Sequence, residues 1–300
     1  MRVYSCIAGF AVLVISFTAA AQPDRAAVAT AVQSSAAVGD RTGIVPSGTE
    51  LALQYEAYFG GFHVASGRTE IQWTDDGYRA TARARARGLL DWYAGWVGEA
   101  QSQGGFMDDG QPAPARHSNE GFWRGNVRAN ELTYGADGTI ALQQVSPPDP
   151  NKLTPIPEET IPGTIDPITA ILTLSRALRD AYECAGELPV YDGRRRYDLT
   201  LEPVGRRVLE PNSYSVFSGE ALECRVSVER IGGFRLEQSR YTETAGERIV
   251  FVASPIGDAP PVPVRIHVKT DYGDLIVHLT AVRYDGSEVA LEPGIDNLAD

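Results

Sequence analysis

The feature that most constrains the fold is a strict two-residue alternation between Tyr78 and Arg87. One set of positions holds Tyr78, Ala80, Ala82, Ala84 and Ala86, and the other holds Arg79, Thr81, Arg83, Arg85 and Arg87. Successive side chains of a β-strand point to opposite faces of a sheet. The pattern therefore predicts a strand with one face of small, mostly alanine residues and one cationic face.

The same period dominates most of the remaining chain. Residues 51–59 and 62–73 alternate around Gly60-Gly61, and Asp75-Asp76-Gly77 is a strong turn signal. Further strands are predicted at 96–106, 115–127, 132–134, 188–191, 194–201, 214–217, 221–230, 234–243, 248–253, 262–270 and 274–284. Strands thus far outnumber helices.

One convincing helix follows a proline-rich connector at 147–162. Asp166 suits the N-cap and Pro167 the first helical position. An apolar stripe at helical spacing follows, made of Ile168, Ile171, Leu172 and Leu178, and the helix should end near residue 181. We therefore expect a mainly β fold: a single antiparallel domain over 49–290, an open or partly closed β-barrel-like sheet with one packed α-helix.

The N-terminus indicates export. Arg2 precedes an apolar run from Cys6 to Phe17, and three alanines end at Ala21. These are the parts of a secretory signal peptide over residues 1–21, and the run is shorter than the ~20 residues that span a bilayer. Residues 22–48 suit a flexible lead-in and 291–300 a C-terminal tail. We expect a periplasmic protein whose mature chain has no transmembrane span.

The net charge argues against one class of partner. The chain carries −12, and removal of Arg2 with the signal peptide makes it −13. An acidic protein lacks the positive field that draws nucleic acid, so no nucleic-acid partner is expected.

Two cysteines, Cys184 and Cys224, remain after cleavage. An oxidising compartment favours a disulfide between them, which would close a loop of about 41 residues and contribute roughly 4 kcal/mol. Two buried free thiols are the alternative. A metal pair is less favoured, because neither cysteine has a Cys or His nearby at ligand spacing.

Two histidines could approach each other. If Tyr272-Gly273 is a two-residue turn, Ile266 faces Leu279 and His267 faces His278 on the polar side. They are weak metal candidates, since a site needs a third ligand and the neighbouring cations oppose one.

Catalytic motifs give little signal. The chain has no Gly-x-Ser-x-Gly elbow, no Walker loop and no dinucleotide fingerprint before a βαβ unit. We expect no cofactor and name no catalytic residue. Glycosidase carboxylates are defined by distance in space, so a hydrolase remains an open alternative.

Arginine is the more informative residue type. The sequence has two clusters, Arg79, Arg83, Arg85 and Arg87 in the first and Arg194, Arg195 and Arg196 in the second. They could bind an anionic ligand or partner, or pair with the protein's own carboxylates on a solvated face. Trp92, Tyr93 and Trp96 follow the first cluster and would form an apolar mouth if exposed, or close the core if buried.

Several segments together carry a family resemblance. They are the opening strand 55–61, the helix start 166–172, the hairpin 189–199 and the segment 219–224. In this order they resemble the exported proteobacterial family called domain of unknown function 3108, over about residues 51–284. The resemblance implies a periplasmic β-rich protein and supplies no reaction or catalytic residues.

The expected function follows from export, the β architecture and the lack of catalytic motifs. The leading hypothesis is a non-enzymatic protein of envelope maintenance that binds a lipid, lipoprotein or other amphiphile on its concave face. The alternatives are an envelope interaction module that uses the arginine faces, and a hydrolase of envelope polymers that uses His267 or His278.

Overall fold

The chain forms a single antiparallel sheet of fourteen strands within the residues that the computed structural model describes: 47–123, 126–145, 147–181, 183–236 and 245–291. The mainly β, barrel-like fold predicted from the sequence is confirmed. The predicted signal peptide, nearly all of the lead-in and all but the first residue of the tail lie outside these ranges and stay predictions.

The strands have the following bounds. They are β1 (Glu50–Phe59), β2 (Phe62–Thr74), β3 (Gly77–Ala86), β4 (Val97–Phe106), β5 (Pro112–Trp123), β6 (Asn126–Tyr134), β7 (Ile140–Val145), β8 (Gly186–Tyr191), β9 (Arg196–Leu209), β10 (Gly219–Gly232), β11 (Ala245–Ala253), β12 (Val262–Thr270), β13 (Leu275–Tyr284) and β14 (Ser287–Ala290). The helices are α1 (Gly88–Ala94) and α2 (Pro167–Ala181), with short 3-10 turns at Pro150–Lys152 and Glu158–Thr160.

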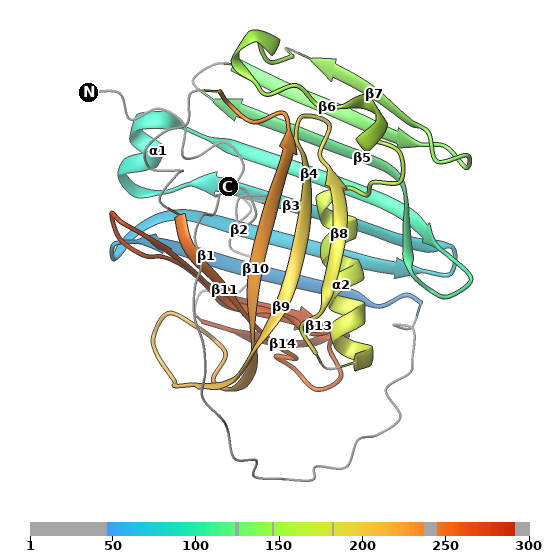
Figure 1. Cartoon of the computed structure of the whole chain (residues 1–300). Helices are drawn as coiled ribbons and strands as arrows, with labels where there is room; N and C mark the ends of the chain where they lie inside the picture. Colours follow the sequence, from blue (N-terminus) through green and yellow to red (C-terminus); the bar gives the residue numbers. More distant parts are fainter. Residues whose placement is uncertain (1–46, 124–125, 146, 182, 237–244, 292–300) are drawn as a thin grey trace.

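Strand order explains the barrel-like shape. The ladder runs β7-β6-β5-β4-β3-β2-β1-β13-β12-β11-β10-β9-β8, with β14 added beside β13. The first strand, β1, therefore pairs with β13 from the C-terminal part of the chain, and β7 and β8 form the two edges. Figure 1 shows β8–β10 crossing in front of β1–β4, with α2 beside β8. The sheet thus curls around the helix.

The two edges of the sheet are connected by side-chain hydrogen bonds and not by a backbone ladder. Asn130 on β6 donates a hydrogen bond to the Asp192 carbonyl (3.1 Å), and Gln144 on β7 donates one to the Gly193 carbonyl (2.7 Å). Beside β8, Ile165 forms an isolated parallel bridge with Val190. The barrel is therefore partly closed, and the exposed backbone of β8 is partly covered.

The two faces of β3 match the predicted alternation. Ala80, Ala82 and Ala84 are buried on the concave face, whereas Arg79 and Arg83 are exposed on the outer face. Leucine, valine and isoleucine of β9–β13 form most of the opposite wall. The core therefore lies between the two walls, around α2.

The disulfide predicted from the sequence is present. Cys184, just after α2, bonds Cys224 on β10, with their Cα atoms 5.6 Å apart. Both residues are buried, so the bond fixes the end of α2 to the sheet.

Several predicted elements need correction. A second helix, α1, follows β3, because Gly88 and Gly95 take positive φ angles that let the chain turn into and out of it. Residues 214–217 form an irregular connection instead of a strand, and β7 and β14 were not predicted. Of the predicted strand 234–243 only 234–236 are described, where Arg235 makes one isolated bridge. No helix within the described ranges is long and apolar enough to cross a membrane.

The predicted register of the last hairpin is wrong by two residues. Ile266 faces Val277, and His278 faces Arg265 instead of His267. The two-residue turn is centred on Asp271-Tyr272, one residue earlier than predicted, because the Gly273 N–H donates to the Thr270 carbonyl at 3.3 Å. A two-residue shift keeps every side chain on its face, so apolar matching could not reveal it.

Candidate functional site

A cavity of about 260 Å³ lies between the concave face of the sheet and α2. Strands β1–β3 line one side, β9–β13 line the other, and the Pro260–Pro263 segment contributes to the rim. This volume is close to the lower end of small-molecule sites, which span about 300–1,000 Å³. The cavity is the candidate functional site.

The cavity exists because one of its walls carries small side chains. Gly67 on β2 and Ala82 and Ala84 on β3 line the cavity and reach little beyond the backbone. The opposite wall carries larger residues, among them Leu199 and Val250. Alanine and glycine leave a gap that a row of leucines would have filled, so the cavity follows directly from the alternation in β3.

Two hydroxyl groups of the lining are hydrogen-bonded within the protein. The Tyr55 hydroxyl donates to the Pro263 carbonyl (3.0 Å), and the Ser175 hydroxyl donates to the Pro261 carbonyl (2.6 Å). Burial raises the pKa of Tyr55, so its hydroxyl stays protonated. The interior therefore presents mainly carbon to a ligand.

One face of α2 grades from apolar to cationic. Ile168, Leu172, Ser175 and Arg179 all line the cavity and recur at the spacing of a single helix face. Ile171, beside them, remains 38% exposed because it borders unfilled space. The helix thus gives the cavity an apolar end near Ile168 and a cationic end, which we define as Arg176 and Arg179.

Arg176 is held in place at the cationic end. Its Nη2 donates to the Asp109 carbonyl in the β4–β5 turn (2.9 Å), and its Nε lies 3.6 Å from an Asp180 carboxylate oxygen. Gly110 permits this approach, since a Cβ there would lie 2.6 Å from Arg176 Nη1 and φ is +77°. Arg176 therefore joins α2 to the neighbouring turn.

A buried polar network holds the other end of α2. The Asp166 carboxylate accepts the backbone N–H groups of Ile168 (2.9 Å) and Thr169 (3.0 Å), which confirms Asp166 as the N-cap. It also accepts the hydroxyls of Ser102 (2.9 Å) and Thr169 (2.5 Å). The network thereby fixes the helix start to β4.

Charge in this network is compensated locally. His117 on β5 lies with Nδ1 3.3 Å from Asp166, and both side chains are fully buried. Burial alone would raise the pKa of Asp166, but the charge of His117 and the hydrogen bonds hold it below its usual value. Burial and the charge of Asp166 raise the pKa of Tyr78 to about 12, and its hydroxyl bonds Thr169 (2.6 Å).

Ser102, His117 and Asp166 do not have the arrangement of a nucleophilic triad. The serine hydroxyl bonds the aspartate, whereas a triad needs it on the imidazole. Ser102 is 1% exposed and the other two are 0% exposed. Their chemistry is that of a helix cap connecting α2 to β4 and β5.

The first arginine cluster lies on the outer face of β3, and of its four residues Arg83 alone is also among those that line the cavity. Arg83 pairs with Glu99 on β4 (2.7 Å), and Arg87 donates from Nε to the Ser66 hydroxyl (2.6 Å). Arg79 is exposed and Arg85 is half-buried on this face. A role of these residues in binding an anion or partner stays a prediction.

The second cluster is folded into the β8–β9 turn. The backbone N–H groups of Arg194 and Arg195 bond Asp192 (2.8 and 2.6 Å). Arg196 is buried, donates to the Thr160 carbonyl (2.8 Å) and pairs with Asp198 (2.5 Å). This geometry serves the turn, and the binding role stays a prediction.

The predicted aromatic mouth is separate from the cavity. Trp96 is buried under the end of β3, whereas Trp92 on α1 is 86% exposed. Neither lines the cavity, and the side chain of Tyr93 lies outside the described part of the protein. Trp96 therefore closes the core.

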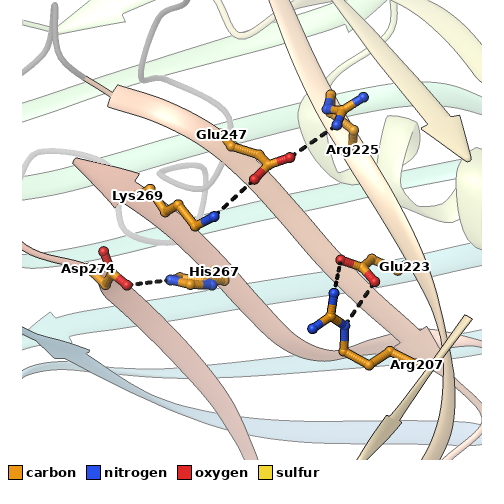
Figure 2. Close-up of polar contacts among 7 residues, drawn as sticks. All are labelled: Arg207, Glu223, Arg225, Glu247, His267, Lys269 and Asp274. Carbon is orange, nitrogen blue, oxygen red and sulfur yellow. Dashed lines mark hydrogen bonds and ion pairs between the residues drawn. The ribbon is translucent and has the colours of Figure 1, made fainter. Parts of the chain in front are cut away.

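Ion pairs cover the outer face of β9–β13 (Figure 2). Arg207 binds Glu223 through two hydrogen bonds of 2.9 and 3.0 Å, and Glu247 bridges Arg225 (3.0 Å) and Lys269 (3.1 Å). These charges pair across neighbouring strands, as expected for a solvated sheet face.

The histidines predicted to face each other have different surroundings. His267 pairs with Asp274 (2.7 Å; Figure 2). His278 lies against the rings of Tyr58 and Tyr214, and burial and the charge of Arg265 lower its pKa to about 4. Among the described residues no three His, Cys, Asp or Glu side chains form a metal-binding group.

The family model described as "Protein of unknown function (DUF3108)" matches residues 54–280, which include α2 and most of the residues that line the cavity. The chain belongs to the DUF3108 family. This confirms the resemblance found in the sequence.

The fold of this DUF3108 protein is similar to one solved structure, a "Beta-barrel-like Protein of Domain of Unknown Function DUF1849 from Brucella abortus". The match covers 79% of this chain and 98% of that chain, with 12% identity and a TM-score of 0.45. No curated protein matches the sequence.

Sequence reasoning missed the residues of the cationic end in this DUF3108 chain. The apolar stripe of α2 was recognised, but its continuation through Ser175 to Arg179 was not. A helix face that changes from isoleucine to arginine was the available signal. The cavity itself had no such signal, since it depends on which strands face α2.

Proposed function

We propose that this DUF3108 protein is exported to the periplasm and binds the apolar part of an amphiphile in the cavity beside α2, in a role in envelope maintenance. The observation that carries the proposal is the cavity of about 260 Å³ with a mainly aliphatic lining. Buried apolar surface is the main source of affinity for such a ligand, at roughly 25 cal/mol per Å². The ligand is a lipid, the acyl group of a lipoprotein or another amphiphile.

The hydrogen bonding in the cavity and the composition of its rim favour a ligand site over a packing defect. The Tyr55 and Ser175 hydroxyls already bond the Pro263 and Pro261 carbonyls, so an entering apolar chain leaves neither of them without a partner. The rim is built from α2 and the Pro260–Pro263 segment, which supply the boundary between the lining and the protein surface.

The ion pairs of the outer-face arginines favour a protein that binds an amphiphile over a module that docks on a partner through these arginines. Arg83 and Arg207 already pair with Glu99 and Glu223. A partner that used these guanidinium groups would have to compete with bonds within the protein.

Mass spectrometry tests the proposal. The protein is expressed with export, purified without detergent, and compared in native and denaturing spectra alongside an organic extract. We expect an additional mass in the native spectrum that denaturation removes and the extract contains. An unliganded native spectrum that stays unchanged after incubation with total envelope lipid extract would contradict the proposal.

A further inference from the structure

Arg179 lies at the cationic end of the cavity-lining helix face and combines charge with unused hydrogen-bonding capacity. It shares that face with Ile168, Leu172 and Ser175. Its Nη1 is shielded from solvent and has no hydrogen-bond partner within the described structure. A buried donor without a partner is costly, so a site of this kind favours an acceptor that arrives with a ligand.

The neighbouring charged groups leave Arg179 as the available cation. Arg176 is used by the Asp109 carbonyl and lies 3.6 Å from Asp180, whereas Arg179 has no ion pair in the part of the chain described. The two arginines and Asp180 together give this end of the cavity one net positive charge. The local charge is therefore opposite in sign to that of the whole protein, −12.

We infer that the ligand is a single-chain amphiphile with an anionic headgroup, whose chain fills the cavity and whose carboxylate or phosphate binds the Arg179 guanidinium. This inference rests on the proposed function and names its ligand class. A guanidinium presents a planar set of donors that matches both headgroups, and such charge-assisted bonds are about twice as strong as neutral ones.

The cavity volume favours a ligand with one hydrocarbon chain over a ligand with two. About 260 Å³ lies near the small end of ligand sites. Ala82 on the sheet and Leu172 on α2 both line the cavity and both belong to one apolar cluster, so packed core adjoins the space. A fatty acid or a lysophospholipid fits this description better than a diacyl lipid.

The experiment compares two fluorescent probes on the oxidised full-length domain. One is a dansyl-labelled undecanoic acid, which carries a carboxylate, and the other is the uncharged N-phenylnaphthylamine. Each is titrated into the wild type, into Arg179→Gln and into a matched control, Arg79→Gln, on the exposed outer face. Circular dichroism and thermal unfolding check that each variant is folded.

We expect Arg179→Gln to weaken binding of the anionic probe about tenfold and to change the uncharged probe less than twofold. Arg179→Lys should recover part of the loss, and Arg79→Gln should behave as the wild type. Equal affinity of the wild type and Arg179→Gln for the anionic probe overturns the inference and leaves the proposed function standing. Failure of both probes to bind the wild type overturns both.

Competition identifies the source of the headgroup. Palmitate and palmitoyl lysophosphatidic acid are each used to displace the anionic probe, with hexadecanol as the uncharged control. Displacement by either acid at about tenfold lower concentration than by the alcohol supports the inference and names the headgroup. Equal potency of all three competitors contradicts it.

Discussion

The two walls of the barrel follow the same alternation but carry side chains of different size. On β3 the concave face holds Ala80, Ala82 and Ala84, whereas on β9 and β11 it holds residues such as Leu199 and Val250. The larger wall packs against α2 as an ordinary core. The small side chains of the other wall leave space between the sheet and the helix, and the cavity, which both walls line, lies there. Alternation fixes which face is buried, and side-chain volume decides whether that face is filled.

The walls also hold α2 in different ways. On the side of β4 and β5 the helix is fixed by the Asp166 network, and on the side of β9 and β10 by apolar contacts of Leu174 and Leu178. Polar attachment at one end lets the helix be held firmly without filling the space beside the small residues.

The largest expected effect concerns the polar attachment. Asp166→Ala removes the helix cap and leaves Ser102, Thr169 and His117 without their shared acceptor, so we expect a loss of about 4 kcal/mol in the free energy of unfolding. Urea unfolding at neutral pH measures it. The exposed Glu202→Ala is the control and should change stability by less than about 0.5 kcal/mol. A loss below about 1 kcal/mol for Asp166→Ala would show that the apolar side alone holds α2.

The next-largest expected effect concerns His278 on β13, one of the strands that carry the larger side chains. Its pKa falls from 6.5 to about 4 in the folded protein. The unfolded chain takes up this proton at higher pH than the folded protein, so the stability it contributes is complete above about pH 6.5 and is lost as the pH falls toward 4. We expect the wild type to lose about 1–2 kcal/mol more than His278→Gln between pH 7 and pH 4.5. Parallel loss in both proteins would contradict the assignment.

The smallest effect lies on the outer side of the small-residue wall. Arg83 and Glu99 pair at 2.7 Å, but both side chains are substantially exposed. A double-mutant cycle with Arg83→Gln and Glu99→Gln should give a coupling energy of about 0.5 kcal/mol that decreases in high salt. A coupling energy above about 2 kcal/mol would mean that this face is more than a solvated surface.

The sequence predicted those features that depend on local pattern. The faces of β3 follow from two-residue spacing, and the start of α2 follows from Asp166 and Pro167. The disulfide follows from an even pair of cysteines in a chain predicted to be exported. Each depends on neighbours in sequence or on simple counting, so a single chain was sufficient.

Other features depend on how distant segments meet. The β12–β13 register was missed because a shift of two residues preserves both faces. Thr270 closes the turn one residue earlier than predicted, and its hydroxyl donates to the Gly273 carbonyl at 2.7 Å. The cavity depends on Ala82 facing α2 across the barrel, which strand alternation cannot specify. Arg179 gains its significance only from this tertiary placement.

The most direct measurement of the central claim fills the cavity and follows binding of N-phenylnaphthylamine. Ala82→Leu extends a side chain into the space, and Ala141→Leu makes the same change on the exposed strand β7. We expect Ala82→Leu to weaken probe binding at least tenfold while its free energy of unfolding stays within about 1 kcal/mol of the wild type, and Ala141→Leu to leave both unchanged. Undiminished probe binding by a folded Ala82→Leu protein would contradict a ligand site between α2 and the sheet.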